Sequence, residues 1–322
     1  MYAPPKSSLM SLRVLVTGAS GFIGKAMCEQ SVRHGFAVNG ALRIPGEVPS
    51  CIEPFVVGEI NAATDFGNAL RDVNAVIHLA ARVHVMHDTA VDPLTAFRAV
   101  NVEGTLNLAR QAASAMVKRF VFISSVKVNG EATLPSRPFT VDDMPAPQDP
   151  YGVSKMEAEQ GLRLIAAESG MEVVIIRPPL VYGLGVKANF AALMLAVQRG
   201  WPLPLGAVHN WRSLVALDNL VDFIVTCIIH PQAANQTFLV SDGQDLSTTE
   251  LVRGMAQAAE VPARLLPVPV WALQAGASLL GKGDAVQRLC GNLQVDISKA
   301  RSLLGWVPPV SVGEGLRRAL EV

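Results

Sequence analysis

Apolar residues along the chain fall into short runs that alternate with segments of helical pattern. The runs, rich in valine, isoleucine and phenylalanine, predict buried β-strands at residues 13–18, 37–43, 54–60, 73–81, 120–125, 172–183 and 236–243. Between most of them lie stretches with the spacing of amphipathic helices. Because near-continuous apolar strands alternate with helices, the pattern predicts an α/β fold with a doubly wound parallel sheet covered on both faces.

A glycine-rich turn follows the first predicted strand. In VLVTGASGFIGKA (14–26), Gly18, Gly21 and Gly24 are spaced three residues apart, between that strand and a helix. Gly18 allows a tight turn, Gly21 lets the backbone approach a diphosphate, and Gly24 lets the helix pack closely on the sheet. The start of the helix then offers unpaired N–H groups to phosphate oxygens. The segment therefore predicts a Rossmann-type dinucleotide site, which also includes Ser20, Phe22 and Ile23.

The alternation of strands and helices ends near Pro178, beyond which prolines and glycines multiply. We therefore expect an N-terminal tail at residues 1–12, a Rossmann-type dinucleotide-binding domain at 13–178 and a smaller C-terminal substrate-binding α/β portion at 179–322. The two larger parts are expected to interleave, with segments of about 211–243 returning to the first domain.

The end of the second predicted strand bears on the choice of dinucleotide. NAD-binding proteins usually carry an Asp or Glu there, which binds the ribose hydroxyls of the adenosine. This chain has Arg43 and no acidic residue, and a guanidinium group can hold the extra phosphate of NADP. Arg43 thus favours NADP(H) over NAD(H), with an exposed arginine that merely follows a strand as the alternative.

The segment DPYGVSK (149–155) places a tyrosine and a lysine one helical turn apart. Asp149 suits the N-cap and Pro150 the first helical position. Tyr151 and Lys155 then lie at i and i+4 on one face of the helix. A phenol has a pKa of about 10, but a neighbouring ammonium group and an oxidised nicotinamide both favour the phenolate. We therefore predict that Tyr151 exchanges a proton with an alcohol while hydride moves at the same carbon.

The glycine triplet, the segment FISSVKVNGE (122–131) and the Tyr151–Lys155 pair together resemble the extended branch of the short-chain dehydrogenase/reductase superfamily, the nucleotide-sugar epimerase/dehydratase group. The resemblance runs through nearly the whole chain and implies an NAD(P)-dependent enzyme. Further stretches are similar to motifs of that group: GEI (58–60), HLAA (78–81), NVEGTLNL (101–108) and RPPLVYG (177–183).

The resemblance also implies roles for individual residues. Ser125 would bind the reacting oxygen and Ser124 would face the cofactor, with the reverse assignment of the two serines left open. Lys155 would also bind the nicotinamide ribose. Further cofactor contacts are implied for residues of the similar stretches: Glu59, Ile60, Leu79, Ala80, Ala81, Asn101 and Pro178.

Substrate-binding residues are implied in both parts of the chain. Arg212 and Asn189 lie where relatives hold a diphosphate, and Arg288 lies where they send a second arginine, although it can equally face solvent. Lys127 and Asn129 stand where many sugar epimerases have other residues. They either contact the substrate or belong to a solvated loop.

The reaction remains open between related enzymes. The resemblance is strongest to bacterial UDP-N-acetylhexosamine C4 epimerases and C4 reductases of surface-polysaccharide (O-antigen) pathways. Because a reductase consumes NADPH, Arg43 favours reduction of a UDP-4-keto-6-deoxy-N-acetylhexosamine to a UDP-N-acetylquinovosamine-type product. The alternative is a UDP-glucose or UDP-N-acetylglucosamine 4-epimerase with tightly bound NAD. A more distant alternative is a non-catalytic dinucleotide-sensing protein.

Composition narrows the remaining classes. In 322 residues, 27 basic side chains balance 27 acidic ones, so no overall field favours nucleic acid. The four cysteines are scattered, and His78, His84, His87 and His209 show no metal spacing, so we expect no metal. No secretory signal is evident, and the apolar stretch 268–281 is too short for a membrane span. We expect a cytoplasmic protein, a homodimer as in relatives.

Overall fold

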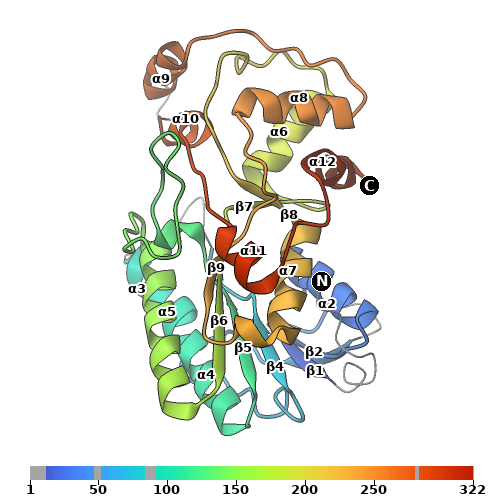
Figure 1. The fold of residues 1–322 in the computed structure, drawn as a ribbon, viewed down its shortest axis with the longest axis vertical. Coiled ribbons are helices and arrows are strands. Elements are labelled where there is room, and N and C mark those ends of the chain that lie inside the picture. The colour runs from blue at the N-terminus through green and yellow to red at the C-terminus, as the bar shows by residue number, and fades with distance from the viewer. Residues whose placement is uncertain (1–11, 47–51, 84–91, 280–282, 322) are drawn as a thin grey trace.

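The structure is a computed structural model that describes residues 12–46, 52–83, 92–279 and 283–321. The predicted tail lies almost wholly outside the described residues, as do Cys51, His84 and His87. The described strands form a seven-stranded sheet in the order β3-β2-β1-β4-β5-β6-β9 and a two-stranded sheet, β7-β8 (Figure 1). The strand bounds are β1 Arg13–Thr17, β2 Ala37–Leu42, β3 Glu53–Val56, β4 Ala75–His78, β5 Arg119–Ile123, β6 Glu172–Arg177, β7 Leu180–Tyr182, β8 Leu214–Ala216 and β9 Thr237–Leu239.

The large sheet confirms the predicted α/β fold with a Rossmann-type doubly wound parallel sheet. All neighbouring strands in it run parallel. The chain starts at β1 in the interior of the sheet, moves outward through β2 and β3, and crosses back to β4 on the other side of β1. Ligands of such sheets bind beyond the carboxyl ends of the strands at this switch point, between β1 and β4.

Helices cover both faces of the large sheet because its strands are apolar on both sides. Val14 and Val16 of β1 belong to one core with α2 and α7, whereas Leu15 belongs to a second core with α4 and α5. In Figure 1 these two helix layers lie on opposite sides of the sheet. The helices around this sheet are α2 Phe22–Arg33, α3 Pro93–Arg98, η1 Ala99–Gly104, α4 Thr105–Ser114, η2 Val126–Val128, α5 Pro150–Ser169, α7 Leu217–Ile229, η3 Pro231–Ala233 and α11 Ser298–Leu304.

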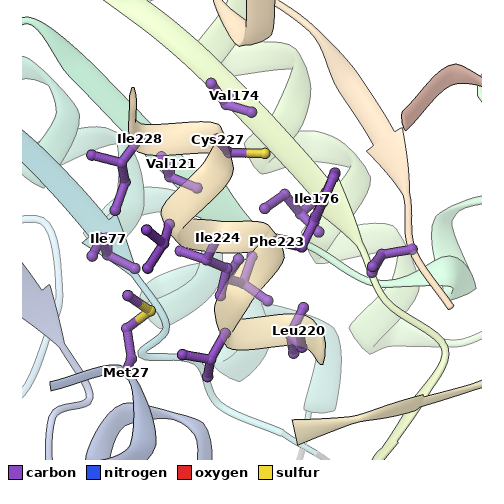
Figure 2. Close-up of a cluster of buried hydrophobic side chains, with 14 of the residues drawn as sticks. Met27, Ile77, Val121, Val174, Ile176, Leu220, Phe223, Ile224, Cys227 and Ile228 are labelled. Atoms are coloured by element: carbon purple, nitrogen blue, oxygen red, sulfur yellow. The ribbon is translucent and has the colours of Figure 1, made fainter. Parts of the chain in front are cut away.

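Helix α7 shows how the first core is packed. Its buried residues Leu220, Phe223 and Ile224 face the strands, and Figure 2 shows them among Ile77 of β4 and Val121 of β5. Helical spacing of large apolar residues therefore draws α7 onto the large sheet, although it comes after residue 179 in the sequence. The predicted boundaries between the parts of the chain stay predictions.

The small sheet and the remaining helices form a separate core in the upper part of Figure 1. Tyr182 of β7, Leu214 of β8 and Phe190 of α6 are buried there. The helices of this part are α6 Ala188–Gln198, α8 Thr248–Ala258, α9 Val270–Leu279, α10 Gly283–Cys290 and α12 Val312–Leu320. No helix within the described ranges combines the length and hydropathy needed to cross a membrane.

Candidate active site

The glycine turn lies at the carboxyl end of β1, at the switch point of the sheet. Gly18 has a φ of +68°, a left-handed conformation that favours glycine, and a Cβ atom on Gly24 would lie 2.0 Å from the Gly18 carbonyl oxygen. Gly21 is the N-cap of α2 and has no side chain to occupy the first N–H groups of the helix. Ser20 and Gly21 are exposed, and Phe22 and Ile23 are partly buried. This bare helix start fits the diphosphate of a dinucleotide.

A buried histidine joins the glycine turn to the end of β4. His78 Nδ1 lies 2.7 Å from Thr17 Oγ1, and His78 Nε2 lies 2.9 Å from Thr105 Oγ1. The Ala80 N–H donates to the same Thr17 hydroxyl at 3.2 Å. Burial, with a smaller contribution from Lys155, lowers the pKa of His78 to about 3, so the ring is neutral at pH 7. The threonine–histidine–threonine chain therefore fixes the two strand ends between which the dinucleotide is predicted to bind.

Two other predicted cofactor residues, Asn101 and Pro178, form hydrogen bonds with backbone groups near the ends of β4 and β5. Asn101 is buried, and its amide accepts from the Arg82 N–H at 2.8 Å and donates to the Arg82 carbonyl at 3.0 Å. It therefore clamps the backbone that follows the partly buried Leu79, Ala80 and Ala81. The Pro178 carbonyl accepts from the Val126 N–H at 3.0 Å.

The predicted adenosine contacts lie at the outer strands. Ile60 is partly buried, and its side chain lies 2.6 Å from where a Cβ on Gly104 would be, so only glycine fits there. Glu59 and Arg43 are exposed. Their contacts with a nucleotide stay predictions.

The first turn of α5 presents the predicted reacting groups. Asp149 caps the helix by accepting from the Gly152 N–H at 2.6 Å, as the sequence predicted. Lys155 is buried and donates from Nζ to the Ile123 carbonyl at 2.8 Å. Its Nζ lies 5.9 Å from the centre of the Tyr151 ring. Ser125 lies close enough to the Tyr151 hydroxyl to affect its pKa, so Ser125, Tyr151 and Lys155 are brought together. The Ser125 Oγ itself accepts from the Lys127 N–H at 3.2 Å.

The protein's own groups set the charges of this cluster. Burial, and then the Asp149 carboxylate, raise the pKa of Tyr151 well above its usual range, while the Ser125 hydrogen bond opposes them. Lys155 is not among the groups that shift the pKa of this phenol in the protein alone, and its effect in the presence of an oxidised nicotinamide stays a prediction. Burial lowers the pKa of Lys155 itself to about 7, and the charge of Glu159 opposes that change. The phenolate thus needs further positive charge, of the kind that an oxidised nicotinamide carries.

Tyr151 lines a cleft of about 460 Å³ between the large sheet and the C-terminal part. Lys127, Arg212 and Arg288, all predicted to bind substrate, line the same cleft. Arg212 donates from Nη1 to the backbone carbonyls of Arg288 at 2.6 Å and Gly291 at 3.0 Å, at the end of α10. Burial lowers the pKa of Arg212, although it remains charged at pH 7. The geometry places cationic groups and a phenol around one space.

Lys127 has acidic partners in the cleft. Its ammonium group contacts Glu131 at 2.9 Å and also pairs with Asp149, the N-cap of α5. Burial alone would lower the pKa of Lys127, but its hydrogen bonds to Asp149 and Glu131 outweigh burial and raise it. Lys127 is therefore a fixed cation beside Tyr151.

The structure places two predicted substrate residues away from this cleft. Asn129 is buried, its Oδ1 accepting from Arg177 at 3.0 Å and its Nδ2 donating to the Thr140 carbonyl at 2.8 Å. Both ends of its amide are thus bonded within the protein, and a contact between Asn129 and the substrate stays a prediction. Asn189 is exposed at the start of α6 and is not among the residues that line the cleft.

The two serines after β5 point in different directions. Ser124 is buried and donates to Glu159 Oε1 at 2.6 Å, whereas Ser125 faces Tyr151. The geometry therefore favours Ser125 as the serine near the reacting oxygen. The Ser124 hydroxyl points to Glu159 and not to the predicted cofactor position.

Comparisons with known proteins bear on the reaction. The chain is 51% identical over 314 residues to a UDP-glucose 4-epimerase of Vibrio cholerae, an alignment that covers 97% of this chain and 95% of that protein. A GDP-6-deoxy-D-mannose reductase of Pseudomonas aeruginosa is 27% identical, covering 97% of each chain. The structure resembles that of a UDP-glucose 4-epimerase of Thermotoga maritima with a TM-score of 0.76 and 23% identity, covering 96% of this chain and 97% of that one.

These similarities overturn the predicted reaction. The prediction of a UDP-4-keto-6-deoxy-sugar reductase is wrong, because the relative that is 51% identical is a 4-epimerase. The prediction depended on Arg43 as an NADP ligand, and Arg43 lies exposed beyond the end of β2. The preference for NADP(H) is likewise unsupported.

The family can be identified from the sequence itself. The profile of the NAD dependent epimerase/dehydratase family matches residues 14–241, a span that includes the glycine turn, Ser125, Tyr151 and Lys155. The chain therefore belongs to the NAD dependent epimerase/dehydratase family.

Proposed function

We propose that this protein is a UDP-sugar 4-epimerase that uses NAD and interconverts the two configurations at C4 of a UDP-hexose. The observation that carries the proposal is the placement of the Tyr151 phenol, beside Ser125, on the wall of the cleft that Arg212 and Arg288 also line. The similarity to a UDP-glucose 4-epimerase supports epimerisation over net reduction of the sugar. UDP-glucose and UDP-N-acetylglucosamine are the two candidate substrates.

Substrate binding follows from the charges in the cleft. A UDP-sugar carries a diphosphate, and Arg212 and Arg288 supply cationic groups on one side of the cleft. The hexose would then extend toward Tyr151 and Lys127 on the other side. A ligand held mainly by its diphosphate leaves the sugar free to turn, which epimerisation at one carbon requires.

The residues of the chain account for the proton movements. NAD, held at the glycine turn, would supply the acceptor and donor of hydride at C4. Tyr151 takes the proton of the C4 hydroxyl as the C–H bond at C4 breaks, and the oxygen becomes a carbonyl oxygen. Ser125 donates a hydrogen bond to that oxygen. After the sugar turns, Tyr151 returns the proton to the oxygen as hydride reaches the other face of C4, so no net oxidation occurs.

The cofactor assignment is part of the proposal. An epimerase oxidises and reduces the same sugar in one cycle, so it gains from a dinucleotide that stays bound. We propose NAD(H), held by the backbone of residues 18–24 and by the residues after β4, with no metal required. Glu59 and Ile60 remain the proposed contacts on the adenosine side, and the homodimer stays a prediction.

The test is direct conversion of each candidate substrate. The purified protein is incubated with UDP-glucose or UDP-N-acetylglucosamine and NAD, and the anomeric proton signals are followed by NMR. We expect the C4 epimer to accumulate to equilibrium without net NADH absorbance. Absence of the epimer from both substrates, while NAD binds, would contradict the proposal and favour the non-catalytic alternative.

A further inference from the structure

Helix α5 carries two arginine–glutamate pairs with the same bidentate geometry but different surroundings. Glu157 binds Arg98 through contacts of 2.8 and 2.5 Å, with side chains 25% and 43% exposed. Glu159 binds Arg177 through contacts of 2.9 and 2.6 Å, with side chains only 1% and 2% exposed. The second pair is thus almost completely removed from water, and no part of the proposed reaction has yet used it.

A buried ion pair needs an explanation other than stability. Moving two charges out of water costs several kcal/mol for each ion, and well-packed apolar residues often stabilise a fold as well or better. The Glu159–Arg177 pair is therefore weak evidence for a contribution to folding. Its neighbours suggest where the charges act.

The pair ties α5 to the segment that carries Ser125. The Ser124 hydroxyl donates to Glu159 Oε1 at 2.6 Å, and Arg177 Nη1 donates to Asn129 Oδ1 at 3.0 Å. These bonds hold both ends of the turn from residue 124 to 129, within which Ser125 and Lys127 lie. Since α5 also carries Tyr151, the network fixes the distance between the serine and the phenol.

The same network lies beside Lys155. Lys155 and Glu159 are one helical turn apart, and they bind consecutive residues at the end of β5, the Ile123 carbonyl and the Ser124 hydroxyl. The charged or titratable groups around Lys155 are Glu159 and Tyr151 on α5 and His78 on β4, which is neutral. Beyond Glu159 lie its two arginine partners, Arg177 on β6 and Arg163 on α5, the latter at 3.4 Å. Glu159 is thus the carboxylate that opposes the effect of burial on Lys155.

We propose that Glu159 and Arg177 are positioning residues of the reaction: the pair holds Ser125 against Tyr151, and Glu159 is the counter-charge of Lys155. The inference rests on the proposed 4-epimerase activity. Neither residue lines the cleft, so both act through other groups.

The test compares Glu159→Gln with Glu157→Gln, two substitutions on one helix that each remove one partner of an arginine–glutamate pair. For Glu159→Gln we expect kcat to fall about 10- to 100-fold, as for groups that orient a reacting centre, with KM for the UDP-sugar changed less than about threefold. We expect Glu157→Gln to retain wild-type kcat.

The pH profile of kcat separates positioning from mere structure. Without the Glu159 charge, Lys155 loses its proton at lower pH, so the alkaline limb of the Glu159→Gln profile moves to lower pH. Glu157→Gln and the charge-conserving Glu159→Asp keep the limb at its wild-type position. If the wild type epimerises but Glu159→Gln matches Glu157→Gln in kcat and profile, the positioning role is wrong while the proposed function stands.

A second variant covers the case in which Glu159→Gln does not fold. Ser124→Ala removes one hydrogen bond to Glu159 and leaves both charges in place. We expect a fall in kcat of about 3- to 10-fold with an unchanged pH profile, the scale of one lost hydrogen bond. Wild-type kcat in Ser124→Ala would overturn the proposal.

Discussion

Polar groups are held differently at the carboxyl edge of the large sheet and on the C-terminal wall of the cleft, the side lined by Arg212 and Arg288. At the sheet edge, Lys155, Ser124 and His78 are buried and bonded to other side chains or to strand ends. On the C-terminal wall, Arg212 is held by backbone carbonyls and Arg288 is exposed. If the protein is the proposed 4-epimerase, this difference gives a fixed reaction centre and a less rigid site for the UDP-sugar, and the proposed mechanism requires the sugar to turn.

The largest effect is expected from substitution of Tyr151, at the carboxyl edge of the large sheet. Tyr151→Phe removes the proton-transfer group while keeping the ring that packs edge-on against Phe97 at 6.1 Å. We expect kcat to fall about 10³- to 10⁴-fold, with NAD affinity and melting temperature retained. Initial rates of epimer formation measure the loss, and fluorescence titration measures NAD binding. Activity within about tenfold of wild type would point to a different base.

The glycine turn tests whether the sheet edge tolerates any change of shape. In Gly24→Ala the new Cβ would lie 2.0 Å from the Gly18 carbonyl oxygen, so α2 must move away from the turn. We expect the free energy of unfolding to fall by about 1–3 kcal/mol and the affinity for NAD to fall strongly.

Gly313→Ala is the matched control for that substitution. Gly313 also lies in a helix, α12, and nothing approaches within 4 Å of its would-be Cβ. Because alanine favours helix more than glycine does, the control should be neutral or more stable by up to about 1 kcal/mol. Chemical denaturation and NAD titration of both variants check the pair. If Gly24→Ala and Gly313→Ala have the same stability and the same NAD affinity, the close approach of Gly24 to Gly18 is not required for folding or for NAD binding.

The same contrast explains which features could be predicted from the sequence. The helix from Pro150 to Ser169, with its Asp149 cap and its end at Gly170, follows from local rules, and so do the strands of the sheet. The bonds of Ser124 and Asn129 join residues 35 and 48 positions away, which local patterns do not encode. Local patterns therefore indicate neither the internal bonds of the Asn129 amide nor the Glu159–Arg177 pair.

The C-terminal wall was harder to predict for a related reason. Arg212 reaches Arg288 across 76 positions through a backbone hydrogen bond, and the segments that bring them together are irregular. Asn189 lies on α6, but on an exposed part of it. A buried histidine between two threonines, such as His78, has a recognisable signal only once strand register is known.

Substitution of the two arginines tests the adaptable side of the comparison. Arg212→Gln should raise KM for the UDP-sugar about 10- to 100-fold, because a partly buried charge on a diphosphate is lost. Arg288→Gln, at an exposed position, should raise KM about 3-fold. Both variants should keep kcat within about fivefold, because neither group touches the reacting carbon.

Arg253→Gln, at an exposed position on α8, is the control and should leave KM unchanged. Steady-state kinetics with UDP-glucose or UDP-N-acetylglucosamine provide the measurement. If Arg212→Gln and Arg253→Gln have the same KM, the diphosphate is held elsewhere, and the comparison between the two walls loses its basis.

The smallest effect is expected at Arg43, on the outer edge of the proposed dinucleotide site. An exposed charge pair contributes about 0.2–1 kcal/mol, so Arg43→Gln should lower NADP affinity by no more than about fivefold and leave NAD affinity unchanged. Isothermal titration with each dinucleotide measures both values. Arg33→Gln, at an exposed position near the end of α2, is the control for the loss of one positive charge. A fall in NADP affinity of about 100-fold would mean that the Arg43 guanidinium group becomes fixed when the dinucleotide binds. The segment after β2 would then resemble the buried, bonded residues of the sheet edge and not the exposed arginines.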